Sequence, residues 1–263
     1  MPAPKNKLKA ALQRGEVQIG LWMAFAHPVA AEIAATAGYD WCLIDGEHGP
    51  NDIPLILSQL QVIADRVPVV LRLPVGQTHL IKQALDLGIQ TLVVPMVDTP
   101  EQAEELVRAV RYPGRGVRGV GAAQARATNY GEITDYVTNA DDEICLIVQM
   151  ESRTSLENIE AIAAVDGVDA VFIGPSDLAA SMGYLGKSTA PEVVEAVGHA
   201  AERILAAGKA VGMITFDANG IAPCLDMGAS FMAVGGDIAS YARGVRSRAI
   251  EAREIVEGHA KKG

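Results

Sequence analysis

The segment ICLIVQME (144–151) is an apolar run that ends in a carboxylate, and VDAVFIGPSD (168–177) repeats this pattern further along the chain. Short runs of β-branched and aliphatic residues that stop at a polar group are typical of strands covered on both faces of a parallel sheet. The two runs therefore predict consecutive strands, with Glu151 and Asp177 placed just beyond their C-terminal ends.

Six further apolar runs occur, and segments with helical periodicity separate them. The eight expected strands are 17–24, 39–45, 67–73, 91–96, 144–150, 168–174, 209–215 and 231–235. The expected helices are 28–38, 52–65, 77–88, 99–111, 154–165, 190–208, 218–228 and 238–257. This alternation predicts an α/β fold, a (β/α)8 TIM barrel that occupies residues 1–263 as a single domain. A doubly wound sheet is the alternative, but no glycine-rich dinucleotide-binding motif follows the first strand.

The composition limits the classes of partner. The formal net charge is −10, which argues against binding to nucleic acid or to an anionic membrane. No apolar run approaches the length of a membrane span, and the basic, amphipathic segment 1–16 lacks the apolar core of a signal peptide. Cys42, Cys145 and Cys224 are odd in number and match no zinc or disulfide pattern, so we expect a soluble, cytoplasmic protein.

Polar residues follow several expected strands, on the side of a barrel where active sites form. Glu151 and Asp177 would meet at this mouth, and with no cysteine nearby their oxygens favour Mg²⁺ or Mn²⁺. The alternative for both is a helix N-cap. His48 lies three residues after Asp45 and suits a general base whose imidazole is oriented by a carboxylate. A helix-capping histidine beside a structural acid is the alternative, and Glu47 could take either part.

Other residues at or near the mouth could have a structural or a functional role. Arg72 lies in an apolar strand, so it must meet a protein carboxylate or a substrate anion. Trp22 ends the first strand and could form a pocket wall or belong to the core. His27 is expected to be a turn residue before a proline. The helix start at 235–237 could bind an anion through free backbone N–H groups. The irregular stretch 112–140 is expected to be functional or an interface element.

Seven motifs occur in an order that covers essentially the whole chain. They are GLWMA (20–24), DGEHGP (45–50), LRLP (71–74), VVPMV (93–97), YPGRGVRG (112–119), QMES (149–152) and GPSDLAASMG (174–183). With these motifs the chain resembles the HpcH/HpaI aldolase family, pyruvate-using class II aldolases related to 4-hydroxy-2-oxoheptanedioate aldolase. The resemblance implies a (β/α)8 barrel, a homo-hexamer built from dimers that exchange the C-terminal helix, and a role in aromatic catabolism.

The resemblance also implies a role for each matching residue. Glu151 and Asp177 would be the metal ligands, His48 with Asp45 the catalytic dyad, and Arg72 the group that polarises the keto oxygen. Substrate-binding residues would be Gln149 beside the metal, and Ser176 and Asp177 through their backbone N–H groups. Trp22 is added to them from its position at the end of the first strand and not from the resemblance. Asp86 and Arg118 would complete the neighbourhood, across a subunit contact or within the chain.

The implied function is that of a metal-dependent carbon–carbon lyase. It would reversibly cleave 4-hydroxy-2-oxo acids to pyruvate, or a related 2-oxo acid, and an aldehyde through a metal-bound enolate, with Mg²⁺, Mn²⁺ or Co²⁺. No lysine is placed for a Schiff base, since Lys209 lies at the start of its strand, on the face opposite the mouth, and Lys82 and Lys187 fall in a helix and a loop. The alternatives are a phosphoenolpyruvate- or acyl-CoA-dependent lyase or transferase, for which Arg115, Arg118 and Arg126 would supply an anion site, and a non-catalytic carboxylate-binding protein.

Overall fold

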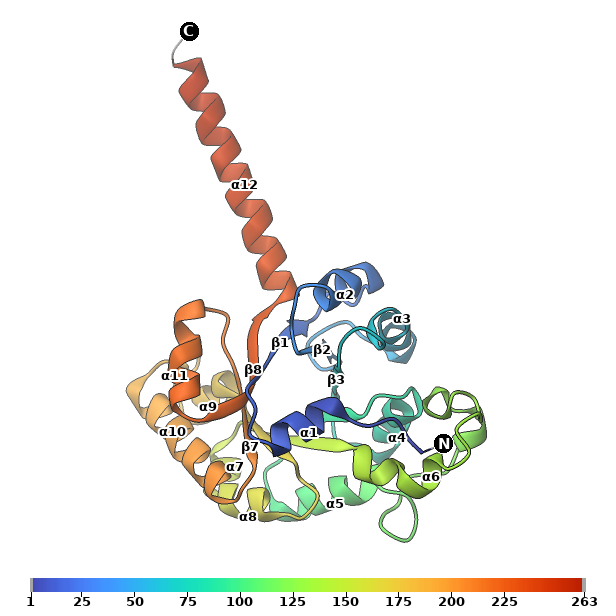
Figure 1. Ribbon diagram of the computed structural model, residues 1–263. Helices are drawn as coiled ribbons and strands as arrows, with labels where there is room; N and C mark the ends of the chain where they lie inside the picture. The colour runs from blue at the N-terminus through green and yellow to red at the C-terminus, as the bar shows by residue number, and fades with distance from the viewer. Residues whose placement is uncertain (1, 262–263) are drawn as a thin grey trace.

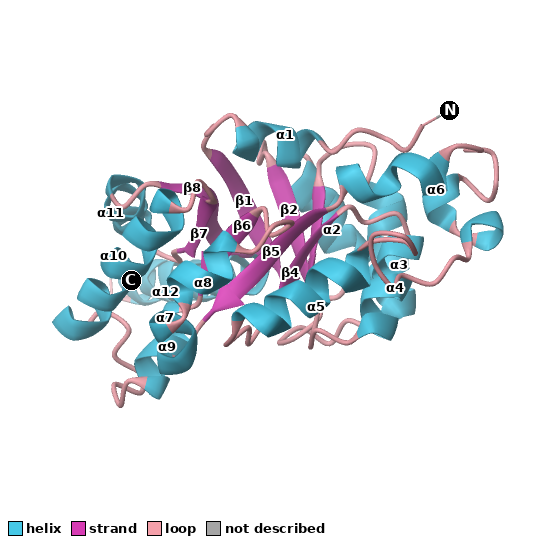
Figure 2. Ribbon diagram, turned by 90° about the horizontal axis from the view of Figure 1, so that it is seen from below, coloured by secondary structure: helices cyan, strands magenta, loops and turns pink. Residues whose placement is uncertain are grey.

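The computed structural model describes residues 2–261 and contains a closed barrel of eight parallel strands, each paired with the next, with β1 closing against β8. Figures 1 and 2 show helices around the outside of this barrel. The strands are β1 (Gln18–Met23), β2 (Trp41–Asp45), β3 (Val69–Arg72), β4 (Thr91–Val94), β5 (Cys145–Met150), β6 (Ala170–Ile173), β7 (Ala210–Ile214) and β8 (Ala229–Gly236). Every strand overlaps the range predicted for it, so the predicted (β/α)8 barrel is confirmed.

The helices account for the predicted helical segments and add three that the sequence did not indicate. The larger ones are α2 (Pro28–Ala35), α3 (Ile53–Ile63), α4 (Thr78–Asp86), α5 (Pro100–Val110), α10 (Pro191–Ala206) and α12 (Asp237–Ala260). The shorter ones are α1 (Lys7–Gln13), α6 (Tyr136–Asn139), α7 (Arg153–Glu157), α8 (Ile159–Ala164), α9 (Pro175–Ser181) and α11 (Ile221–Asp226). The unpredicted helices are α1, α6 and α9.

Side chains alternate between the inside of the barrel and the surrounding helices, as strand geometry requires. On β2, Trp41 and Leu43 belong to the interior cluster, whereas Cys42 and Ile44 pack in the outer layer. Asp45 is the next inward position, at the C-terminal end of the strand. The same alternation brings the ends of β1, β3 and β5 inward, and this positions the polar residues of the site.

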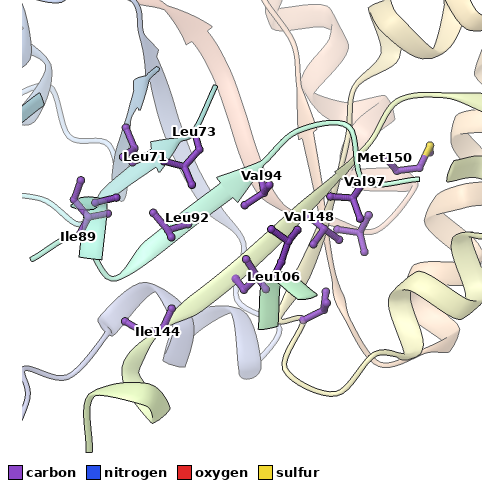
Figure 3. Packing of buried hydrophobic residues seen from close by; sticks show 14 of the residues in the cluster. Leu71, Leu73, Ile89, Leu92, Val94, Val97, Leu106, Ile144, Val148 and Met150 are labelled. Carbon is purple, nitrogen blue, oxygen red and sulfur yellow. The ribbon is translucent and has the colours of Figure 1, made fainter. Parts of the chain in front are cut away.

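The outer layer consists of aliphatic side chains between the strands and the helices. Figure 3 shows outward residues of β3, β4 and β5, among them Leu71, Leu92 and Val148, with Leu106 of α5 beside them. The opposite end of the barrel is closed by α1, whose Leu8 and Leu12 join the interior cluster. This leaves the C-terminal strand ends as the accessible mouth.

One close approach inside the barrel requires a glycine. A Cβ atom on Gly20 would lie 2.1–2.3 Å from the Trp41 ring, which is fully buried and stacks on Phe231 with 4.1 Å between ring centroids. We expect Gly20→Ala to lower the free energy of unfolding by about 1–3 kcal/mol through overpacking. Gly198→Ala, in α10 with nothing within 4 Å of a new Cβ, should instead stabilise by about 0.5–1 kcal/mol. Urea unfolding of both variants checks this; equal stabilities would contradict it.

The last helix, α12, extends away from the barrel (Figure 1) and has no buried residue. It exposes six large apolar side chains: Ile238, Tyr241, Val245, Ile250, Ile255 and Val256. The long C-terminal helix expected from the sequence is therefore present. Within residues 2–261, no helix is both long enough and apolar enough to cross a membrane.

Candidate active site

A cavity of about 450 Å³ lies at the C-terminal ends of the strands. It brings together seven residues that the sequence singled out: Trp22, Asp45, His48, Arg72, Gln149, Ser176 and Asp177. Glu151 lies directly beside it, because its carboxylate accepts a hydrogen bond from Gln149 Nε2. These residues come from distant parts of the chain and meet only because the barrel closes.

Asp45 is held by five N–H groups. Its carboxylate accepts hydrogen bonds from Arg72 Nε and Nη2 at 2.9 and 2.6 Å, from Trp22 Nε1 at 2.9 Å, and from the backbone N–H groups of Glu47 and His48. Burial acts to raise the pKa of Asp45, but the hydrogen bonds and charge of Arg72, together with Trp22 and the Glu47 amide, outweigh it and hold the pKa below 3.8. Asp45 is therefore a fixed anion at the cavity wall.

Arg72 is placed by register, since its Cα is paired with that of Asp45 between β2 and β3. Its guanidinium is buried, lies 4.7 Å from the centroid of the Trp22 ring, and forms a second ion pair with Glu47 Oε2 at 2.7 Å. Arg72 was expected to meet either a protein carboxylate or a substrate anion. It meets the protein carboxylates, and it also lines the cavity where a substrate anion could reach it. Trp22 is buried and also forms part of the cavity wall, so both roles considered for it apply.

His48 is exposed and lines the cavity from the turn after β2. Its backbone N–H bonds to Asp45, but within residues 2–261 its imidazole makes no hydrogen bond to that carboxylate. The N-cap of the following helix α3 is Asp52, so His48 caps no helix. Glu47 is next to it, and burial, with Asp45 and Asp177 adding to it, raises the pKa of Glu47 despite the charges of Arg72 and His48.

Glu151 follows β5 and is 7% exposed. Its Oε1 accepts a hydrogen bond from Met96 N at 2.7 Å, and Met96 adopts a left-handed backbone conformation with a φ of 57°. Such strain in a non-glycine residue is characteristic of functional sites. Burial raises the pKa of Glu151, and the carboxylates of Glu47 and Asp177 add to this effect. The N-cap of α7 is Ser152, so Glu151 does not serve as a cap.

Asp177 and Ser176 lie in the first turn of α9, and both are exposed. The N-cap of that helix is Gly174, without a side-chain hydrogen bond, so Asp177 is not a cap either. Backbone N–H groups in a first helical turn lack partners within the helix, which leaves those of Ser176 and Asp177 to a ligand. A Cβ on Gly174 would lie 2.9 Å from Glu151 Oε2, so this glycine makes room for the carboxylate.

The residues around Glu151 fit a divalent cation. Gln149 Oε1 is buried and has no hydrogen-bond partner, although a buried carbonyl oxygen ordinarily has one. The Glu151 carboxylate, whose pKa the charge of Asp177 helps to raise, forms with Asp177 and the Gln149 oxygen a hard-oxygen donor set suited to Mg²⁺ or Mn²⁺. In the described part of the chain no three His, Cys, Asp or Glu side chains form a complete ligand cluster, so waters or substrate would supply the other ligands.

Some features of the site were not anticipated. At the start of α12, the Asp237 carboxylate accepts the N–H groups of Ala24, Phe25 and Ile238, so the protein's own carboxylate takes the place expected for an anion. Its position in a Gly-Gly-Asp turn could have indicated this. The apolar walls Phe172, Ile214 and Phe216 were missed, since apolar residues at strand ends look like core. His27 is the N-cap of α2, in agreement with the expected turn residue.

Asp86 and Arg118 do not line this cavity. They form an ion pair at 3.0 Å, and Arg118 is fully buried, with its guanidinium 4.4 Å from the centroid of the Tyr112 ring. Asp86 ends α4, which runs away from the mouth, so within one chain the pair lies outside the site. The other loop arginines have partners elsewhere, Arg115 with Asp142 and Arg126 with the Leu87 carbonyl. The three arginines therefore form no shared anion site.

Comparison with known proteins gives the family of the chain. The model of the family "HpcH/HpaI aldolase/citrate lyase" matches residues 18–244. A "Hydroxypyruvate/pyruvate aldolase" of Deinococcus radiodurans is 54% identical over 256 residues, 95% of this chain and 92% of that protein. A "2-keto-3-deoxy-L-rhamnonate aldolase" of Klebsiella pneumoniae is 51% identical over 244 residues, 92% of this chain and 91% of that protein. The crystal structure of an HpcH/HpaI aldolase/citrate lyase family protein from Burkholderia cenocepacia superposes with a TM-score of 0.91 and 38% identity, over 95% of this chain and all of the other.

Proposed function

The chain belongs to the HpcH/HpaI aldolase/citrate lyase family, and we propose that it is a metal-dependent aldolase. It would reversibly cleave 4-hydroxy-2-oxo acids to an aldehyde and pyruvate, or a related 2-oxo acid such as hydroxypyruvate. The observation that carries the proposal is the meeting of a fixed guanidinium, an exposed imidazole and an oxygen donor set in one cavity. The relatives named as aldolases support the reaction class.

Substrate binding follows from the fixed dipoles and charges at the mouth. The backbone N–H groups of Ser176 and Asp177 would receive the carboxylate of the 2-oxo acid, as helix starts receive anions. Arg72, immobilised by Asp45, would direct a remaining N–H group at the keto oxygen. Gln149 Oε1 and the pair Glu151 and Asp177 would hold the cation, which supplies a Lewis acid when bound.

The proton transfers are assigned to His48. In the cleavage direction it removes the proton of the 4-hydroxyl group, the bond between C3 and C4 breaks, and its electron pair becomes the enolate of the 2-oxo acid. Arg72 stabilises the negative charge that develops on the keto oxygen, an interaction stronger in the transition state than in the ground state. The same imidazole then returns the proton to C3, which gives the methyl group of pyruvate.

Asp45 would position His48 through hydrogen bonds to the backbone of the turn and not through a hydrogen bond to the imidazole ring. Its carboxylate bonds to the backbone N–H groups of Glu47 and His48, so it fixes the path of the turn that carries the imidazole. Asp45 also fixes Arg72 on the same wall. One buried anion would thus position both the proposed base and the proposed electrophilic donor.

No lysine of the described chain lines the cavity, which supports the metal-dependent route over a Schiff base. Lys209 bonds to the carbonyl of Val168, at the N-terminal end of the barrel. We expect excess EDTA to lower pyruvate release from 4-hydroxy-2-oxo acids at least about tenfold, and Mg²⁺, Mn²⁺ or Co²⁺ to restore it. A coupled assay of pyruvate release measures this. Full activity in EDTA, or a borohydride-trapped pyruvate adduct, would refute the proposal.

The alternative classes are separated by the same assay. A phosphoenolpyruvate- or acyl-CoA-dependent enzyme needs a larger anion site, and the loop arginines are engaged separately. A non-catalytic carboxylate-binding protein would release no pyruvate from any 4-hydroxy-2-oxo acid. His48→Ala serves as the control, because it should bind pyruvate and yet lack turnover.

Three expectations remain proposals alongside the activity. We propose that residues 1–263 form one domain, that the protein is cytoplasmic, and that it is a homo-hexamer in which α12 packs on another subunit. The apolar side chains that α12 exposes support the last of these. Light scattering of the purified chain measures the mass in solution.

A further inference from the structure

A second cavity, of about 570 Å³, lies beside the catalytic cavity. The two share four lining residues, Pro175, Ser176, Ile214 and Phe216, which form the boundary between them. Phe216 follows β7 and is 53% exposed as a residue. The second cavity is therefore next to the place where the substrate would bind, on the other side of these four residues.

The lining of the second cavity is apolar. Its walls come from β6, β7, α10 and α11, and the apolar members are Ile173, Val194, Val197, Met213, Pro223 and Met227. Cys224 adds a thiol whose pKa is raised by burial, so it remains neutral. At the rim the polar groups satisfy one another, since Thr215 Oγ1 donates to the Asp217 carbonyl and the Asp217 carboxylate accepts Asn219 N. The cavity thus offers contact area without a strong demand for a polar ligand.

The catalytic cavity has apolar lining on the side that it shares with the second cavity. Asp45, His48, Arg72 and Asp177 line the catalytic cavity alone, whereas Ile214 and Phe216, together with Pro175 and Ser176, line both cavities. An apolar group attached to the reacting carbon would be destabilised beside the charged residues, which it would desolvate, and stabilised by burial beside the apolar ones. It would therefore extend past Phe216.

We propose that the second cavity binds the non-reacting substituent of the aldehyde, and that this substituent is an alkyl chain or an aryl ring. The inference rests on the aldolase function proposed above and specifies its acceptor class. A cavity of this volume is within the ordinary range for small-molecule sites. Each methylene group buried there should raise kcat/KM by up to about fourfold.

Selectivity between a long and a short substrate tests the proposal. The two substrates are the 4-hydroxy-2-oxo acids formed from pyruvate with hexanal and with acetaldehyde. Wild-type enzyme should prefer the long substrate, and Val194→Trp, which fills the cavity from its solvent side on α10, should lower the ratio of the two kcat/KM values at least about tenfold. His199→Trp is the matched control, on the same helix and exposed but outside the lining, and should leave the ratio unchanged.

A binding measurement separates this inference from the reaction itself. Met213 and Met227 both line the cavity, so their ¹³C-methyl NMR signals should move in a saturable way when 1-hexanol is added to the full-length protein. The signals of the core residues Met23 and Met150 should stay in place, and Val194→Trp should abolish the shifts.

The outcomes distinguish the two proposals. Shifts at Met213 and Met227 in a protein that releases no pyruvate from any 4-hydroxy-2-oxo acid would support the apolar site and contradict the aldolase. Pyruvate release without any methyl shift, or a selectivity ratio that Val194→Trp does not change, would overturn the acceptor assignment and leave the aldolase standing.

Discussion

Replacing Arg72 with leucine is expected to lower the free energy of unfolding at pH 7 by about 3–5 kcal/mol, because the buried Asp45 carboxylate loses its countercharge. Arg72 donates two hydrogen bonds to that carboxylate, and both side chains are less than one-tenth exposed. If Arg72 also stabilises the keto oxygen as proposed, kcat/KM should fall by about a hundred- to a thousandfold. Urea unfolding and the pyruvate-release assay measure the two effects.

The pH dependence of the variant identifies Asp45 as the source of the loss. In the wild-type protein the pKa of Asp45 lies below 3.8, so its contribution to stability is present above the unfolded pKa and is lost as the pH falls through the folded one. Without Arg72, burial dominates and the folded pKa moves above 3.8. The variant should then lose stability as the pH rises from acid, so its deficit is largest near neutrality and shrinks near pH 3.8.

Matched substitutions control this prediction. Arg66→Leu removes an ion pair with Glu32 in which both side chains are about half exposed, and it should cost less than about 1 kcal/mol. Arg72→Lys keeps the charge and loses the bidentate contact with Asp45. Its free energy of unfolding should therefore lie between those of wild type and Arg72→Leu. A deficit of Arg72→Leu that is the same at pH 3.8 and pH 7 would exclude Asp45 as its cause.

Replacing Glu151 with glutamine is expected to separate stability from activity. The carboxylate is buried beside Glu47 and Asp177, and these charges together with burial raise its pKa. The neutral isostere should therefore raise the melting temperature in the absence of added cation. Activity should fall by more than about a hundredfold, since even residues that only orient a metal ligand change affinity or activity by about 10–100-fold.

Cation-dependent melting gives a readout other than activity. In the wild-type protein, Mg²⁺ or Mn²⁺ should raise the melting temperature, because a ligand that binds only the folded state stabilises it. In Glu151→Gln this rise should disappear. Glu157→Gln, an exposed position of α7, should behave as wild type in both respects. A melting temperature that cations raise equally in Glu151→Gln and in wild type would argue against Glu151 as a ligand.

Much of the fold could be read from local pattern. Each apolar run forms a strand, because strands covered on both faces of a parallel sheet have nearly continuous aliphatic sequences. The segments between the runs form helices. The C-terminal ends of the strands gather at one mouth of a parallel barrel, which is why the polar residues there indicated a site. In the structure, Trp22, Asp45, Arg72 and Gln149 occupy inward positions near strand ends and line the cavity.

The partners of these residues were decided by tertiary structure. The pairing register between β2 and β3 sets Arg72 beside Asp45, and the Asp45 carboxylate consequently bonds to a guanidinium and not to the His48 ring. The N–H group that holds Glu151 comes from Met96, more than fifty residues away, in a backbone conformation that no local propensity favours. Neither contact leaves a signal in the spacing of residues.

The sequence by itself determined the barrel, its mouth and the residue types gathered there, because strand period and strand ends are local properties. Only the tertiary structure decided the direction of each carboxylate, the buried Gln149 oxygen without a partner, and the apolar cavity behind Phe216. These depend on register, on barrel closure and on helices α9 to α11 packed against neighbouring strands. They are nonlocal contacts, formed only once the chain has closed on itself.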